Sequence, residues 1–126
     1  MVFDQLLLRP TLLDIDLDAI AHNFSVIRQT APNCQIMCVL KANAYGHGLI
    51  PCGRLFEKLG AHFLGVALVE ECMMLRRAGI SIPILIFGGI WGAQIKLFLD
   101  YDLDLTASSV SKLEAIEEVA SAAGKR

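Results

Sequence analysis

The sequence has few charged residues, and no part of it carries a large excess of positive charge. Only 19% of its 126 residues are charged, and the formal net charge is −2 at pH 7. Lysine and arginine adjoin one another only in the pairs Arg76-Arg77 and Lys125-Arg126. A nucleic acid or an anionic membrane surface is bound through a cluster of basic side chains. The composition therefore argues against both kinds of partner.

The patterns of a metal site, a disulfide framework and a nucleotide site are also missing. The four cysteines form no Cys-x-x-Cys pair, and the three histidines stand at unrelated spacings. We therefore expect no metal and predict buried, reduced thiols. Gly46 and Gly48 imitate the start of a dinucleotide fingerprint, but Pro51 occupies the position of its third glycine. The sequence has no Walker pattern.

Membrane-spanning and secretory segments are not predicted either. The longest uncharged stretch, residues 78–95, is interrupted by glycine, proline and polar residues. A signal peptide has a positively charged region followed by a hydrophobic core, and the first residues of this sequence have no such region. We therefore expect a cytoplasmic protein.

What the sequence does contain is an alternation of short apolar runs with segments of helical periodicity. Residues 12–17 alternate between apolar and polar, which predicts a strand with one solvated face. Asp18 is a candidate cap for a helix that reaches Thr30. Four strand–helix units follow, with strands at 35–41, 63–67, 82–87 and 103–106 and helices at 47–59, 68–78, 92–100 and from Ser109 or Ser111 to 123.

Strands that alternate with helices in this way predict a parallel α/β sheet with both faces of its strands buried. Four such units are half of a (β/α)8 TIM-type barrel, a fold of about 250 residues. We therefore expect residues 13–126 to form the amino-terminal half of such a barrel. Half a barrel leaves two strand edges and an inner face uncovered. The chain is thus predicted to be a fragment, or to be completed by another chain.

A lysine stands at the end of the first of these buried strands. If side chains alternate along the strand, Met37, Val39 and Lys41 share one face. The carboxyl ends of parallel strands are where α/β proteins build their active sites, and apolar surroundings favour the neutral amine that forms Schiff bases. Tyr45, four residues later, is within reach of a group bound to that amine. Asn43, Gly46 and Gly48 indicate that the chain turns here and then enters a helix.

The stretch from Lys41 to Gly48, Lys-Ala-Asn-Ala-Tyr-Gly-His-Gly, closely resembles the pyridoxal-phosphate signature of the alanine racemase family. The resemblance implies that Lys41 carries pyridoxal 5'-phosphate and that Tyr45 holds the cofactor phosphate. It also implies cofactor contacts at Val39 and Leu85, with Gly88-Gly89 facing the same cavity. The activity implied is the interconversion of L-alanine and D-alanine, which supplies D-alanine for cell-wall peptidoglycan.

The same resemblance assigns residues 1–12 to a lead-in and to the start of a strand that joins a carboxyl-terminal β-domain absent from this chain. It implies a homodimer in the full-length protein, with the second acid-base residue supplied by the partner subunit. The chain alone is then expected to be inactive. Two alternatives stay open: a racemase for serine or lysine on the same fold, and a non-catalytic half-barrel interaction module.

Other polar residues receive plainer interpretations. His47 belongs to the motif and is expected to stabilise the turn, whereas His22 and His62 have no partner visible in the sequence. Glu70 and Glu71 fall on a predicted helix, where a solvated face is the ordinary explanation.

Overall fold

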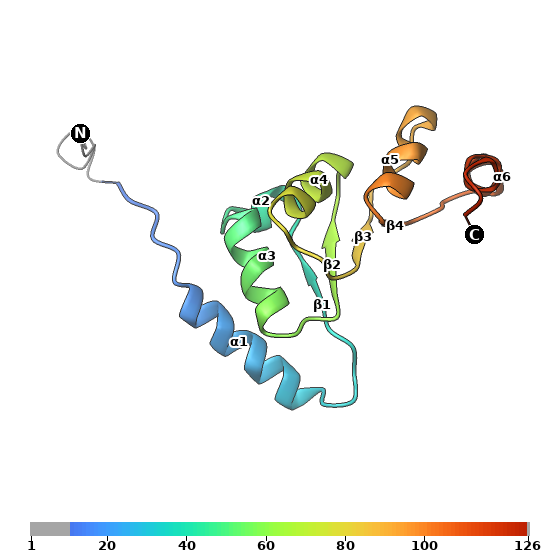
Figure 1. Cartoon of the computed structure of the whole chain (residues 1–126). Coiled ribbons are helices and arrows are strands. Elements are labelled where there is room, and N and C mark those ends of the chain that lie inside the picture. Colours follow the sequence, from blue (N-terminus) through green and yellow to red (C-terminus); the bar gives the residue numbers. More distant parts are fainter. Residues whose placement is uncertain (1–10, 126) are drawn as a thin grey trace.

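The computed structural model describes residues 11–125, which form one parallel sheet and the helices connected to it. The elements follow one another as α1 (Leu17–Thr30), β1 (Met37–Val39), α2 (Lys41–Tyr45), α3 (Leu49–Lys58), β2 (Phe63–Val66), α4 (Val69–Arg77), β3 (Ile84–Ile86), η2 (Gly92–Gln94), α5 (Ile95–Asp100), β4 (Asp104–Leu105) and α6 (Val110–Ala122). Figure 1 shows α3 and α4 side by side against the sheet, and α6 at the far end of the chain.

The four strands are all parallel and lie in the order β1-β2-β3-β4. Sequential parallel strands joined by helices are the first half of a barrel, so the predicted fold class is confirmed. Two strands, β1 and β4, are edges of the sheet within residues 11–125.

Only one face of this sheet is fully buried. Cys38, Leu64 and Ile84 stand in register on the face covered by helices, and each is at most 9% exposed. On the other face Met37 and Val39 remain 38% and 37% exposed. The prediction that the strands are buried on both faces is therefore wrong for β1, because no described element covers the inner side.

Helix ends lie where the sequence predicted them. Gly60, Gly79 and Gly124 follow α3, α4 and α6 with φ of 77°, 85° and 67°. This left-handed conformation closes helices and is easiest for glycine. Ser109 caps α6, its hydroxyl accepting a hydrogen bond from the Lys112 N–H at 3.3 Å.

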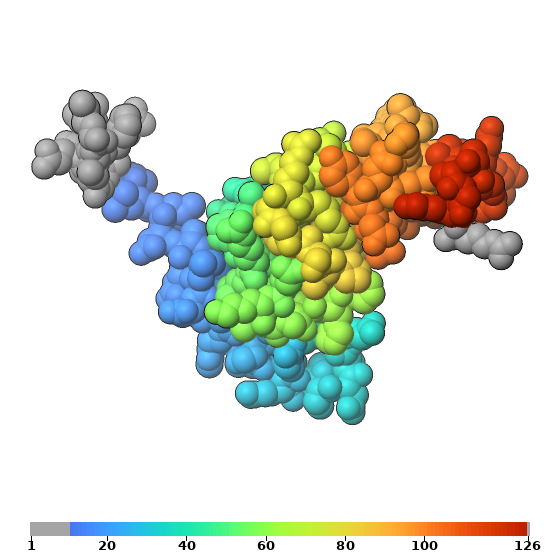
Figure 2. Space-filling model, in the orientation of Figure 1, coloured from blue at the N-terminus to red at the C-terminus, as the bar shows by residue number. Residues whose placement is uncertain are grey.

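The amino-terminal prediction needs correction. Residues 11–16 have no assigned strand, and Leu17 already belongs to α1. The helix cap is Asp16 and not Asp18, because Asp16 Oδ1 accepts hydrogen bonds from the N–H groups of residues 18 and 19. Figure 2 shows this segment (blue) standing away from the body, and no strand within residues 11–125 pairs with it. The assignment of residues 1–12 to another domain stays a prediction, and residues 1–10 lie outside the described part.

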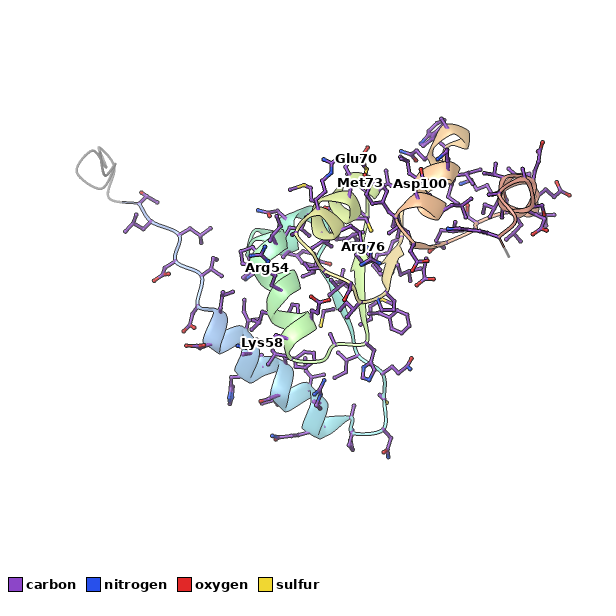
Figure 3. The ribbon with its side chains drawn as sticks, viewed as in Figure 1. Arg54, Lys58, Glu70, Met73, Arg76 and Asp100 are labelled. Carbon is purple, nitrogen blue, oxygen red and sulfur yellow. The ribbon has the colours of Figure 1, made fainter. Side chains whose placement is uncertain are left out.

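Two charged side chains join the loops at the amino ends of the strands. Arg76, on α4, donates to four backbone carbonyl oxygens, those of Ile80, Ile82, Tyr101 and Asp102. Glu57, on α3, accepts from the Ser81 N–H and hydroxyl and from the Ile82 N–H. These bonds lower the pKa of Glu57 below its ordinary value. Figure 3 labels Arg76 on the side of α4 that faces the second half of the chain.

His62 also has a partner that the sequence did not reveal. Its Nδ1 accepts a hydrogen bond from the Ile36 N–H at 2.9 Å, which fixes the loop before β1.

No helix within residues 11–125 is both long enough and apolar enough to cross a bilayer.

Candidate active site

Lys41 lies directly after β1, at the carboxyl edge of the parallel sheet. The strand ends at Val39, and Leu40 has φ −118° and ψ 8°, so the predicted extended strand through Lys41 is two residues too long. Leu40 is 1% exposed and anchors this point in the core. Lys41 itself is half-buried, and its amine has no carboxylate partner among residues 11–125.

The chain then makes a turn in an unusual conformation. Ala42, Asn43, Ala44 and Tyr45 have φ of 54°, 56°, 54° and 54°, so four successive residues with side chains are left-handed. This conformation costs roughly 1–2 kcal/mol for each residue that has a Cβ. The sequence predicted a turn here from Asn43, Gly46 and Gly48, and it did not indicate that Ala42, Ala44 and Tyr45 would be left-handed. Gly46 and Gly48 also have positive φ, at 91° and 97°.

Hydrogen bonds inside the turn hold it closed. The Ala44 N–H donates to the Leu40 carbonyl at 2.7 Å, and the Gly48 N–H donates to the Asn43 carbonyl at 2.9 Å. The Asn43 side chain accepts from the Leu49 N–H at 2.8 Å and so caps the start of α3. His47 Nδ1 lies 2.9 Å from the Ala44 carbonyl, which confirms its predicted turn-stabilising role.

A carboxylate from another element reaches the same turn. Glu71, on α4, accepts a hydrogen bond from the Ala42 N–H at 2.7 Å. Its second oxygen accepts from the N–H groups of Ala67 and Leu68 at 2.9 and 3.1 Å. The interpretation of Glu71 as part of a solvated face is therefore wrong. It was missed because a glutamate in the first turn of a helix is common, and no sequence pattern reveals a contact across 29 residues.

The other predicted site residues do not all line the same cavity. Val39 and Tyr45 line one cavity of about 200 Å³, whose remaining walls are Ile20, Leu40, Ala44, His47, Cys52 and Phe56. Leu85 does not line this cavity, although it stands in the same register row as Val39, with Gly65 between them. Tyr45 is 60% exposed, and its hydroxyl forms no hydrogen bond with residues 11–125.

The second glycine pair lies elsewhere. Gly88 and Gly89 line a different hollow of about 290 Å³, formed by the loops after β2 and β3 together with Trp91 and Phe98. Lys41 is not among the walls of this hollow or of the cavity lined by Val39 and Tyr45. That Gly88 and Gly89 face the same cavity as Lys41 stays a prediction.

One thiol, that of Cys52, lines the cavity of Val39 and Tyr45 and donates a hydrogen bond to the His47 carbonyl at 3.6 Å. Burial raises the pKa of Cys38 to about 11 and that of Cys72 to about 12, although Arg76 lowers the latter slightly. Burial also raises the pKa of Cys52. These three are free and buried, as predicted, whereas Cys34 is free but exposed. No cluster of possible metal ligands occurs in the described part of the chain.

Comparison with known proteins identifies the family of this chain. Residues 15–126 match the family model described as the alanine racemase N-terminal domain. The alanine racemase of Desulforamulus reducens is 42% identical over 118 residues, which are 93% of this chain and 32% of that protein. The chain thus spans about a third of the length of the curated relatives it matches.

Solved structures give the same result for the fold. An alanine racemase from Streptomyces lavendulae superposes with a TM-score of 0.81 at 39% identity, covering 87% of this chain and 29% of that one. A histidine racemase from Leuconostoc mesenteroides superposes with a TM-score of 0.80 at 31% identity, covering 87% and 30%. On the extent of the family match and on these identities, the chain belongs to the alanine racemase N-terminal domain family.

Proposed function

We propose that this chain is the cofactor-binding half-barrel of an enzyme that interconverts L-alanine and D-alanine with pyridoxal 5'-phosphate. The single observation that supports it most is the amine of Lys41, which is half-buried at the carboxyl edge of the sheet and free of any carboxylate in the described residues. Such an amine is available to bind an aldehyde covalently.

The residues around Lys41 suit this cofactor. In the proposed assignment the Tyr45 hydroxyl, which is exposed and unpaired within residues 11–125, donates a hydrogen bond to the cofactor phosphate. Val39 and Leu85 present apolar side chains from one register row, and Gly65 between them has none. When bound, pyridoxal phosphate stabilises the negative charge that forms when the substrate Cα loses its proton.

The proposed chemistry of this chain centres on Lys41 Nζ. It binds the cofactor at rest and, once released, holds and returns the Cα proton on one side of the substrate. Racemisation needs a second acid-base group on the opposite side, and the family resemblance assigns it to a partner subunit of a homodimer. We therefore propose that the chain by itself does not racemise alanine, and that the complete dimer supplies D-alanine for peptidoglycan in the cytoplasm.

Borohydride reduction tests the cofactor assignment directly. The complete gene product is incubated with pyridoxal phosphate and reduced, and the labelled peptide is identified by mass spectrometry. We expect label on Lys41, no label in Lys41→Ala, and normal labelling in Lys58→Ala, a control whose side chain lies on the exposed end of α3. Label on another lysine, or none, would overturn the proposal and favour a half-barrel that acts as an interaction module.

The substrate requires a separate test. Because a histidine racemase shares this fold at a TM-score of 0.80, another amino acid is the second candidate substrate. We expect the complete gene product to racemise alanine faster than serine, lysine or histidine when each is assayed by chiral chromatography. A faster reaction with any of the other three would replace alanine in the proposal and keep the role of Lys41.

A further inference from the structure

Glu71 connects the turn that carries Lys41 to the loop after the neighbouring strand. We infer that Glu71 is a positioning residue that fixes the peptide bond between Lys41 and Ala42 and thereby sets the direction of the lysine side chain. The functional part of this inference rests on the proposed role of Lys41. The structural part, a clamp on the Ala42 N–H, is independent of it.

The contact lies at the point where the backbone changes hand. Ala42 is the first left-handed residue, and its N–H belongs to the peptide group that begins at the Lys41 carbonyl. That N–H donates to Glu71 Oε1 at 2.7 Å. The later N–H groups of the turn bind carbonyl oxygens nearby, for example Gly46 to Ala42 and Asn43. The first one is instead satisfied from α4, so the start of the turn depends on Glu71.

A carboxylate is the group that this position requires. One oxygen faces the Ala42 N–H and the other faces the N–H groups of Ala67 and Leu68, at 2.9 and 3.1 Å. All three partners are donors, so both oxygens must accept, and a negative charge strengthens each bond. A glutamine offers one oxygen only and would point its NH₂ group at another N–H.

Glu71 contacts the turn after Lys41 through the backbone and forms no ion pair with the lysine. The only ion pair within residues 11–125 is Lys96–Asp100, on the surface of α5. Both oxygens of Glu71 accept hydrogen bonds from backbone N–H groups, and neither forms an ion pair with the Lys41 amine. Glu71 therefore supports the lysine through the backbone and does not tie up its amine.

Helix capping alone would not need the bond to Ala42. The Leu68 N–H lies three residues before Glu71 and belongs to the start of α4, so this bond caps the helix. The bond to Ala42 spans 29 residues and joins a different element. A variant that keeps the cap but cannot reach Ala42 separates the two roles. Glu71→Asp is that variant, because it retains the charge with a side chain one carbon shorter.

The first test measures the clamp without any cofactor. Hydrogen exchange of single amides is followed by mass spectrometry with electron-transfer fragmentation in the complete gene product. In Glu71→Gln and Glu71→Asp we expect the Ala42 amide to exchange at least about tenfold faster, the factor that corresponds to losing one charge-assisted hydrogen bond. Glu70→Gln is the matched control, since Glu70 is the adjacent, exposed residue of the same helix turn (Figure 3).

The second test measures the consequence for Lys41. The rate at which pyridoxal phosphate becomes fixed to Lys41 by borohydride is expected to fall about tenfold in both Glu71 variants, for the same loss of one charged bond. The labelling rate should be unchanged in Glu70→Gln, and Glu71→Asp should not restore it to the wild-type value. A failure of the proposed function can be distinguished from a failure of the clamp. A wild-type protein without label overturns the proposed function, and the exchange of Ala42 then decides on the clamp.

Unchanged exchange at Ala42 in the Glu71 variants would overturn the clamp, whatever the labelling shows. Faster exchange at Ala42 with normal labelling of Lys41 would overturn the positioning role. If Glu71→Gln does not fold, Glu71→Asp is subject to the same outcomes, with the Leu64 amide in the sheet as the reference for global unfolding. That amide donates to the Pro83 carbonyl at 2.9 Å and is not one of the three amides that Glu71 binds.

Discussion

Two adjacent glycines after β3 should respond in opposite ways to the same substitution. A Cβ atom added at Gly88 would lie 2.2 Å from the carbonyl oxygen of Ala67, whereas at Gly89 the nearest atom would be Lys112 Nζ at 3.4 Å. Neither glycine has a positive φ, so the backbone itself would accept alanine at both positions. The difference between the two variants therefore measures the close approach of the loops after β2 and β3.

The magnitude follows from what can move. At Gly89 the neighbour is the end of a flexible side chain, so alanine should be neutral or stabilise the protein by about 0.4–1 kcal/mol through the unfolded chain. At Gly88 the neighbour is backbone, and the Ala67 N–H is itself held by Glu71 at 2.9 Å. Moving the two loops apart by about 1 Å should cost about 1–3 kcal/mol, the usual range for overpacking. This cost exceeds the stabilisation that alanine gives through the unfolded chain.

Urea denaturation of the complete gene product, followed by circular dichroism, gives the free energy of unfolding of each variant. We expect Gly88→Ala to be less stable than wild type and Gly89→Ala to be at least as stable. Equal stabilities for the two variants would refute the reasoning, because the close contact would then have no energetic consequence. A loss at Gly89 that exceeds the loss at Gly88 would refute it as well.

Two further predictions concern the loops at the opposite edge of the sheet. The pKa of Glu57 is lowered in the folded state by bonds from Ser81 and Ile82, so its contribution should be complete above the ordinary value of 4.5 and disappear as the pH falls through the lower folded value. Glu57→Gln should thus destabilise the protein at pH 7 and converge with wild type in acid, which urea titrations at several pH values would reveal or contradict. Arg76→Lys should cost about 2 kcal/mol of unfolding free energy, because lysine cannot donate in a fork to several carbonyl oxygens, whereas Arg77→Lys, at an exposed position of α4, should cost almost nothing. Similar values for the two arginine variants would show that the four bonds are not stabilising.

The order of elements was predictable because each depends on local pattern. Apolar runs of strand length, helical periodicity and glycines after helices give signals that do not need the rest of the fold. The strand at 12–17 failed for the converse reason. Alternation describes a surface that could pair, but a strand forms only when a partner offers backbone groups. Asp16, read as part of that strand, instead caps α1.

The place of Lys41 at the carboxyl edge of the sheet was predictable, and the geometry of the turn after it was not. A lysine at the end of a buried strand indicates the carboxyl edge of the sheet, and the eight-residue motif indicates the family. The left-handed backbone from Ala42 to Tyr45 has only Asn43 as a local signal, because alanine and tyrosine rarely adopt it. The partner that secures its start, Glu71, lies in another element and has an unremarkable place in its helix.

The strained turn after β1 is held in place by contacts with several elements of the fold. A left-handed residue with a side chain costs roughly 1–2 kcal/mol, about as much as one net hydrogen bond returns, so a run of them cannot persist on its own bonds. The turn is held at three places: Leu40 is buried in the core, Asn43 caps α3, and Glu71 binds Ala42 from α4. These anchors belong to the first two strand–helix units, because α4 follows β2. If Glu71 positions Lys41 as we propose, the direction of the Lys41 amine depends on the packing of both units and not on the eight-residue motif alone.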